Sequence, residues 1–115
     1  MEIRSKIWLE INGEPVFGSG REELLRAVDR LGSINKAARD INLSYRKALS
    51  YIQSMEERLG IRMVERKAGG RHGGGAVLTK EARDFLRKYT ALCKGVNEMM
   101  DRRFRKVFGG KDNHV

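Results

Sequence analysis

Residues 33–60, SINKAARDINLSYRKALSYIQSMEERLG, decide the fold of this chain. Ser33 and Ser44 each precede a run of apolar residues at helical spacing, and a serine at this place can accept a hydrogen bond from a free amide of the first turn. Gly60 favours a helix end at the residue before it. The pattern predicts two helices joined by a tight turn at residues 42–43.

The second of these helices has two different faces. Its inward positions are apolar: Ala48, Leu49, Ile52, Met55 and Leu59. Its outward positions are basic or polar: Arg46, Lys47, Ser50, Gln53, Ser54 and Glu57. In the first helix the pair Ala37-Ala38 faces inward, where small side chains allow another helix to cross closely. We therefore expect a packed helical hairpin that presents a basic face to solvent.

The segment before this hairpin predicts two strands and a helix. Residues 6–11 alternate apolar and polar side chains, and Asn12-Gly13 follows, which is a strong signal for a two-residue β-turn. Ser19 and Glu22 have the spacing of a capping box, which predicts a helix start stabilised by both side chains. Gly32 predicts the end of that helix.

The segment after it predicts two short strands, 62–66 and 76–79, around a glycine-rich loop, 69–75. Thr79 can cap a last helix from about 80 to 106, and such a helix is about 40 Å long at the usual rise. Its apolar stripe extends beyond what so small a domain can cover. We expect the distal stripe to pack against the same helix of a second copy.

The charge is unevenly distributed. Residues 1–43 carry seven basic and seven acidic side chains, residues 44–75 seven and three, and residues 80–111 ten and four, within a net charge of +9. Such asymmetry favours a polyanionic partner over a merely solvated basic surface. Cys93 is the single cysteine, so no internal disulfide can form. Neither a membrane span nor a signal peptide is predicted, and we expect a cytoplasmic, nucleoid-associated protein.

Double-stranded DNA is the polyanion that these motifs favour. The first turn of a helix can project donors into a major groove, and glycines let a neighbouring loop approach phosphates. The predicted DNA-binding residues are Ser33, Lys36, Ser44, Tyr45, Arg46, Lys47, Ser50, Ser54, Arg66, Lys67, Arg71 and His72. A solvated helical hairpin and a featureless flexible loop are the structural alternatives. A phosphate-binding P-loop is excluded because Gly75-Ala76 stands where Gly-Lys-Ser/Thr is required.

Catalysis and metal binding have no motif in this sequence. His72, His114 and Cys93 lack the spacing of metal ligands, and no nucleophile, base and orienting group come together. Cys93 lies on the apolar stripe of the last helix, which favours a buried structural thiol. We expect no enzyme activity and no cofactor.

The motifs resemble a known family. Its residues here are Gly32-Ser-Ile-x-x-Ala-Ala38, Leu43-Ser-Tyr-Arg-x-Ala48 and Glu56-x-x-Leu-Gly60, followed by Val64-Glu-Arg66, Gly69-Gly-Arg71 and Gly73-Gly-Gly-Ala-Val-Leu-Thr79. The first three patterns resemble LysR-type winged helices. The last three are similar to the DNA-binding domain of the molybdate-responsive regulator (ModE) family, and the likeness covers about residues 6–95.

The resemblance implies a fold that is mainly α with small β-sheets, a winged helix-turn-helix that dimerises through its N-terminal hairpin and long helix on a palindromic operator. The expected interface residues are Trp8, Leu86, Tyr89, Cys93, Val96 and Met100. The oxyanion-binding domain of ModE regulators has no counterpart in the 115 residues, so the resemblance supports DNA binding but not molybdate sensing, and the effector stays open.

These arguments predict three parts: a winged helix-turn-helix with its hairpin, 1–79; a long dimerisation helix, 80–108; and a frayed tail, 109–115. The leading hypothesis is a homodimeric, sequence-specific transcriptional regulator. A non-specific architectural DNA-binding protein is the first alternative. A module that docks an acidic partner or a separate effector-sensing protein is the second.

Overall fold

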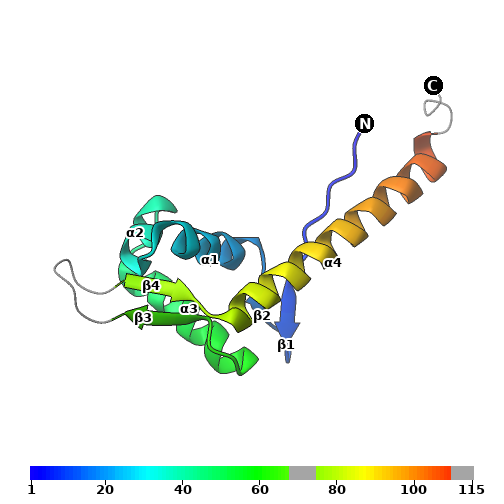
Figure 1. Ribbon diagram of the computed structural model, residues 1–115. Coiled ribbons are helices and arrows are strands. Elements are labelled where there is room, and N and C mark those ends of the chain that lie inside the picture. Colours follow the sequence, from blue (N-terminus) through cyan, green and yellow to red (C-terminus); the bar gives the residue numbers. More distant parts are fainter. Residues whose placement is uncertain (68–74, 110–115) are drawn as a thin grey trace.

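The computed structural model describes residues 1–67 and 75–109. In chain order the elements are β1 Leu9–Ile11, β2 Glu14–Phe17, α1 Ser19–Leu31, α2 Ile34–Asp40, α3 Tyr45–Leu59, β3 Val64–Lys67, β4 Gly75–Leu78, α4 Lys80–Phe104 and a π-helical turn, η1 Arg105–Gly109. Three helices and two hairpins form a compact head, and α4 leaves it as a long rod (Figure 1). The predicted class, mainly α with small β-sheets, is confirmed.

The N-terminal hairpin forms as predicted. β1 pairs antiparallel with β2, so that Leu9 lies opposite Phe17 and Ile11 opposite Glu14. Asn12 and Gly13 have φ values of 54° and 82°. A two-residue turn with both φ values positive matches the twist of the strands that it joins, which explains why this dipeptide sets the register.

The capping box predicted at Ser19 is wrong. Gly18 occupies the cap position, no side chain caps the helix, and Ser19 is already its first helical residue. The extended backbone of Gly18 places its carbonyl to accept from the amide of Glu22 at 2.9 Å, so the helix starts one residue early. The predicted end is confirmed, since Gly32 has φ 70° and its amide donates to Val28.

The helix-turn-helix is confirmed with both caps. The Ser33 hydroxyl accepts from the amide of Lys36 at 3.1 Å, and the Ser44 hydroxyl accepts from the amide of Lys47 at 3.0 Å. Asn42 makes the turn with φ 62°. These local bonds fix where α2 and α3 begin.

The core lies between α1, α2, α3 and the first turns of α4. Ala37 and Ala38 are completely buried where α2 crosses its neighbours. Phe17 packs edge-to-face on Phe85 and Tyr89, with ring centroids 4.8 and 4.9 Å apart. The hairpin therefore shares one aromatic cluster with α4.

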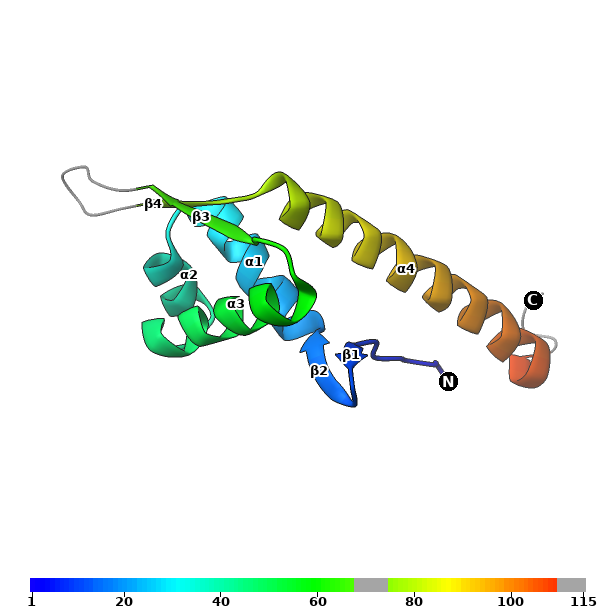
Figure 2. The ribbon, with the colours of Figure 1, turned by 90° about the horizontal axis from the view of Figure 1, so that it is seen from below.

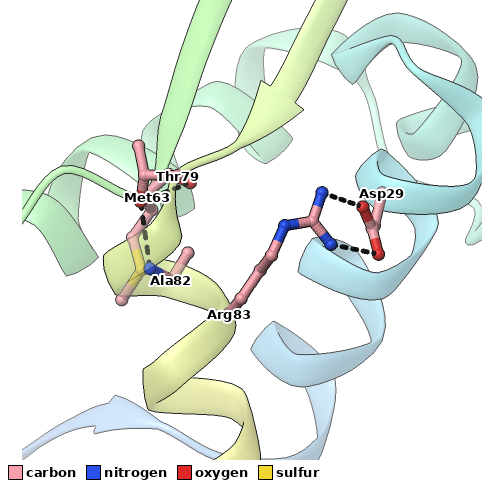
Figure 3. A network of polar contacts seen from close by, with 5 residues as sticks. All are labelled: Asp29, Met63, Thr79, Ala82 and Arg83. Carbon is pink, nitrogen blue, oxygen red and sulfur yellow. Dashed lines mark hydrogen bonds and ion pairs between the residues drawn. The ribbon is translucent and has the colours of Figure 1, made fainter.

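The second sheet pairs β3 with β4 antiparallel, from Val64 opposite Leu78 to Lys67 opposite Gly75. Its base is joined to α4 through Thr79 (Figure 3). The Thr79 hydroxyl accepts from the amide of Ala82 at 3.0 Å and donates to the carbonyl of Arg62 at 2.6 Å. Thr79 therefore both follows the last strand of this sheet and caps the start of α4.

The long last helix is confirmed. The chain measures 62 × 30 × 24 Å along its principal axes, and α4 accounts for the elongation (Figure 2). The N-terminal segment runs beside it: the Tyr89 hydroxyl donates to the carbonyl of Ile7 at 2.7 Å, and the Ser5 hydroxyl donates to Asn97 Oδ1 at 2.7 Å. In the described ranges, no helix has the length and apolar character needed to cross a bilayer.

Candidate nucleic-acid interface

The start of α3 presents its polar side chains to solvent. Tyr45, Arg46, Lys47 and Ser50 are all exposed, while Ser54, further along the helix, is half-buried. Tyr45 keeps 40% of its surface accessible although it belongs to a well-packed helix. The predicted reading residues thus form a continuous outer surface on the first two turns of α3.

The two cap serines sit at the same edge of the head. The oxygens of Ser33 and Ser44 each accept a backbone amide, which leaves each hydroxyl hydrogen able to donate to another acceptor. Lys36, one turn into α2, is exposed. Two donor hydroxyls and an ammonium therefore lie at the beginnings of α2 and α3, as an anionic backbone requires.

The sheet adds two exposed cations, Arg66 and Lys67 on β3. Arg66 Nη2 donates to the Tyr45 hydroxyl at 2.8 Å, so the wing strand and α3 meet at their polar edges. The amide of Ala76 donates to the carbonyl of Gly32 at 2.9 Å, which holds β4 against the end of α1. The other two predicted wing residues, Arg71 and His72, lie outside the described residues.

Ion pairing leaves this surface positive. The recorded pairs join Arg4 to Glu2, Arg26 to Glu22, Arg30 to Asp40, Arg58 to Glu14, Arg83 to Asp29, and Arg87 and Lys88 to Asp84. For residues 1–67 and 75–109, no recorded pair includes Lys36, Arg46, Lys47, Arg66 or Lys67. Their charges are thus not compensated by contact with a carboxylate, and they are available to attract a polyanion.

The residues predicted at a dimer interface fall into two groups. Leu86 and Tyr89 are each only 5% exposed, and their burial is accounted for inside one chain. Burial raises the pKa of Tyr89 to about 12, with a smaller contribution from Cys93.

The other predicted interface residues are more accessible. Cys93, Val96 and Met100 are half-buried, and Trp8 is exposed with its indole N–H donating to Glu10. Beyond Tyr89, α4 also exposes Leu92 and Met99, and η1 exposes Val107 and Phe108.

Two residues that position the surface have roles that the sequence did not reveal: Glu56 was named only as part of a family pattern, and Arg58 was not singled out. Glu56 Oε2 accepts from the amides of Met63 and Val64 at 2.9 and 3.2 Å, which ties the end of α3 to the start of β3. Arg58 donates to the Glu14 carboxylate at 3.0 Å and to the carbonyl of Ile11 at 3.1 Å. A charged residue near a helix end gives no sequence signal that names such distant partners.

No metal centre is found on the described part of the chain: no group of three or more His, Cys, Asp or Glu side chains could hold an ion there. The charged side chains at the beginnings of α2 and α3 are the cations Lys36, Arg46 and Lys47, and β3 carries two cations, Arg66 and Lys67, against one carboxylate, Glu65. Chemically, that arrangement suits the binding of an anionic polymer.

Comparison with known proteins gives a family. The family model described as "Bacterial regulatory helix-turn-helix protein, lysR family" matches residues 22–83. The molybdenum-pterin-binding protein MopB of Rhodobacter capsulatus is 40% identical over 84 residues, which cover 73% of this chain and 31% of that protein. The molybdenum transport protein ModE of Azotobacter vinelandii is 41% identical over 93 residues, which cover 78% and 34%.

The solved structures agree. The structure titled "Crystal Structure of BenM_DBD/benA site 1 DNA Complex" is 28% identical with a TM-score of 0.54 and covers 78% of this chain and 96% of that one. The chain spans about a third of the length of the curated relatives it matches. The resemblance to LysR-type and ModE proteins is confirmed. By the match over residues 22–83, the chain belongs to the lysR family of bacterial regulatory helix-turn-helix proteins.

Proposed function

We propose that this chain is the sequence-specific DNA-binding part of a transcriptional regulator and not an enzyme. One observation carries the proposal: the first turn of α3 exposes Tyr45, Arg46 and Lys47 beside the basic strand β3. Relatives named as ModE transcriptional regulators, and a family neighbour solved with DNA, support it. Its compartment would be that of the DNA, the cytoplasm.

In this proposal α3 enters a major groove. Arg46 has the forked donors that match O6 and N7 of guanine, and Ser50 lies one turn further on the same exposed side. Ser33, Ser44, Lys36 and Lys67 contact phosphates, which set the register of the protein on the duplex. Arg71 and His72 add a wing contact, assigned from the sequence alone.

A second copy completes the proposed regulator. Leu92 and Met99 are 46% and 50% exposed on α4, and half-buried Val96 and Met100 lie between and beside them on the same rod. Two α4 helices that cover each other would remove this apolar surface from water. We assign residues 80–108 to dimerisation. The first turns of α4 also pack into the hydrophobic core that residues 1–79 form. Two-fold symmetry then implies a palindromic operator with half-sites about 34 Å apart.

The test is a selection of bound fragments from bacterial genomic DNA by the purified chain, followed by titration of the selected operator and of a random duplex. We expect the operator to be preferred. Arg46→Ala should weaken operator binding by about 10- to 100-fold, the range for loss of a bidentate base contact, and weaken random-duplex binding much less. Lys94→Ala, an exposed charge on α4, is the matched control and should change neither.

Two results would change the proposal. Equal losses on both duplexes would move Arg46 from base reading to phosphate binding. No preference for any fragment, together with a steep dependence of affinity on salt, would leave the non-specific architectural function instead.

A further inference from the structure

A small hollow lies where α2, α3 and the wing strands meet. Among its lining residues are Ser33 at the start of α2, Tyr45 at the start of α3, Arg66 near the end of β3 and Gly75 at the start of β4. Four elements, α2, α3, β3 and β4, therefore contribute to one concave, polar site on the proposed DNA-binding surface.

The contact between Tyr45 and Arg66 determines what this hollow can bind. Arg66 uses one N–H to donate to the phenol oxygen at 2.8 Å, and a guanidinium has five such donors. A phenol is a neutral acceptor, so it orients the guanidinium and leaves its positive charge in place. A carboxylate would orient the guanidinium and also neutralise that charge. No carboxylate is recorded in an ion pair with Arg66 for the residues that the structure describes. Arg66 is thereby held in place and still fully cationic.

The walls of the hollow are also fixed. The amide of Ala76 donates to the Gly32 carbonyl at 2.9 Å, and a Cβ added at Gly75 would stand 3.1 Å from that carbonyl. The start of β4 is thus held close to Gly32 at the end of α1, and Ser33 follows directly. Because the Ser33 oxygen accepts the Lys36 amide, its hydroxyl hydrogen can donate into the hollow.

We propose that this hollow binds one phosphate of the DNA backbone through Arg66 and Ser33, and that Tyr45 is a positioning residue that orients Arg66 and does not read a base. The inference rests on the proposed DNA-binding function. Its physical basis is that a guanidinium holds a phosphate best when its plane is fixed in advance, because less side-chain freedom is then lost on binding. A Tyr45 turned toward a base edge would break the bond to Arg66.

The test is a double-mutant cycle with Tyr45→Phe, Arg66→Gln and both changes, measured on the selected operator and on a random duplex over a series of salt concentrations. Tyr45→Phe removes only the hydroxyl, and we expect it to weaken binding to both duplexes by the same factor, about fivefold for one net hydrogen bond. Arg66→Gln should weaken binding more and reduce the salt slope by about 0.9. In the Arg66→Gln background, Tyr45→Phe should have no further effect.

Tyr51→Phe is the matched control, since Tyr51 lies on the same helix and its ring packs under the Arg21 guanidinium at 4.4 Å, away from Arg66. It should leave affinity unchanged, and thermal unfolding of every variant checks that the fold is kept. Losses that multiply in the double variant, or a Tyr45→Phe loss confined to the operator, would overturn the inference while leaving the DNA-binding function in place. Failure of the unmodified chain to bind any duplex would instead refute the proposed function, and this inference with it.

Discussion

The hydroxyl of Thr79 should contribute about 2 kcal/mol to the free energy of unfolding, from an N-cap of about 1 kcal/mol and a second hydrogen bond of about 1 kcal/mol. Its side chain is 7% exposed and accepts from the amide of Ala82 (Figure 3). It also donates to the carbonyl of Arg62. Thr79→Val preserves the shape and removes only the hydroxyl. The backbone bond from Thr79 to Met63 remains.

Urea unfolding of the full chain at one fixed protomer concentration measures the loss, since dimerisation would couple stability to concentration. Thr79→Ser keeps the hydroxyl, so its free energy of unfolding should decrease much less than that of Thr79→Val. Ser33→Ala removes a cap with a single recorded bond and should lose about 1 kcal/mol. The reasoning is refuted if Thr79→Ser loses as much as Thr79→Val, or if Thr79→Val loses no more than Ser33→Ala.

Two further outcomes are expected. Burial raises the pKa of Tyr89 to about 12, above the value of about 10 for an unfolded chain. The contribution of Tyr89 to the free energy of unfolding is therefore complete below pH 10 and is lost as the pH rises toward 12. The urea midpoint should fall over this interval, and it should fall less in Tyr89→Phe. In the proposed dimer, the unmodified chain should sediment as a dimer, the double variant Leu92→Glu/Met99→Glu should sediment as a protomer, and the control Lys94→Glu should remain dimeric. A double variant that still sediments as a dimer would rule out this stripe as the interface.

Local signals in the sequence predicted most of the fold. Ser33, Ser44 and Thr79 were identified as caps because a hydroxyl before a helical run acts on amides only a few residues away. The same reasoning failed at Ser19, where the extended Gly18 lets the helix start earlier. A capping box needs a hydroxyl at the cap position, and here that position is occupied by Gly18, which has no side chain.

Contacts between elements could not be predicted in this way. The hydrogen bond from Arg66 to Tyr45 joins residues 21 positions apart, and the bond from Arg58 to Glu14 spans 44 positions. Neither follows from a periodicity, because both depend on how finished elements pack. The same limit affects Leu86 and Tyr89: they share one helical stripe with Val96, and only the packed hairpin reveals that the first two are covered within the chain.

The direction of α4 is determined far from the proposed DNA-binding surface. Arg83 makes a two-point ion pair with Asp29 of α1, at 2.8 and 3.1 Å (Figure 3). The Tyr89 hydroxyl donates to the carbonyl of Ile7. Because α4 begins directly after the wing strand, these contacts orient the rod relative to α3. In the proposed dimer, two rigid rods that pair beyond Tyr89 would convert that orientation into the distance between the two reading helices. Half-site spacing would then depend on residues that never contact DNA, whereas the choice of bases would depend on Arg46 and its neighbours.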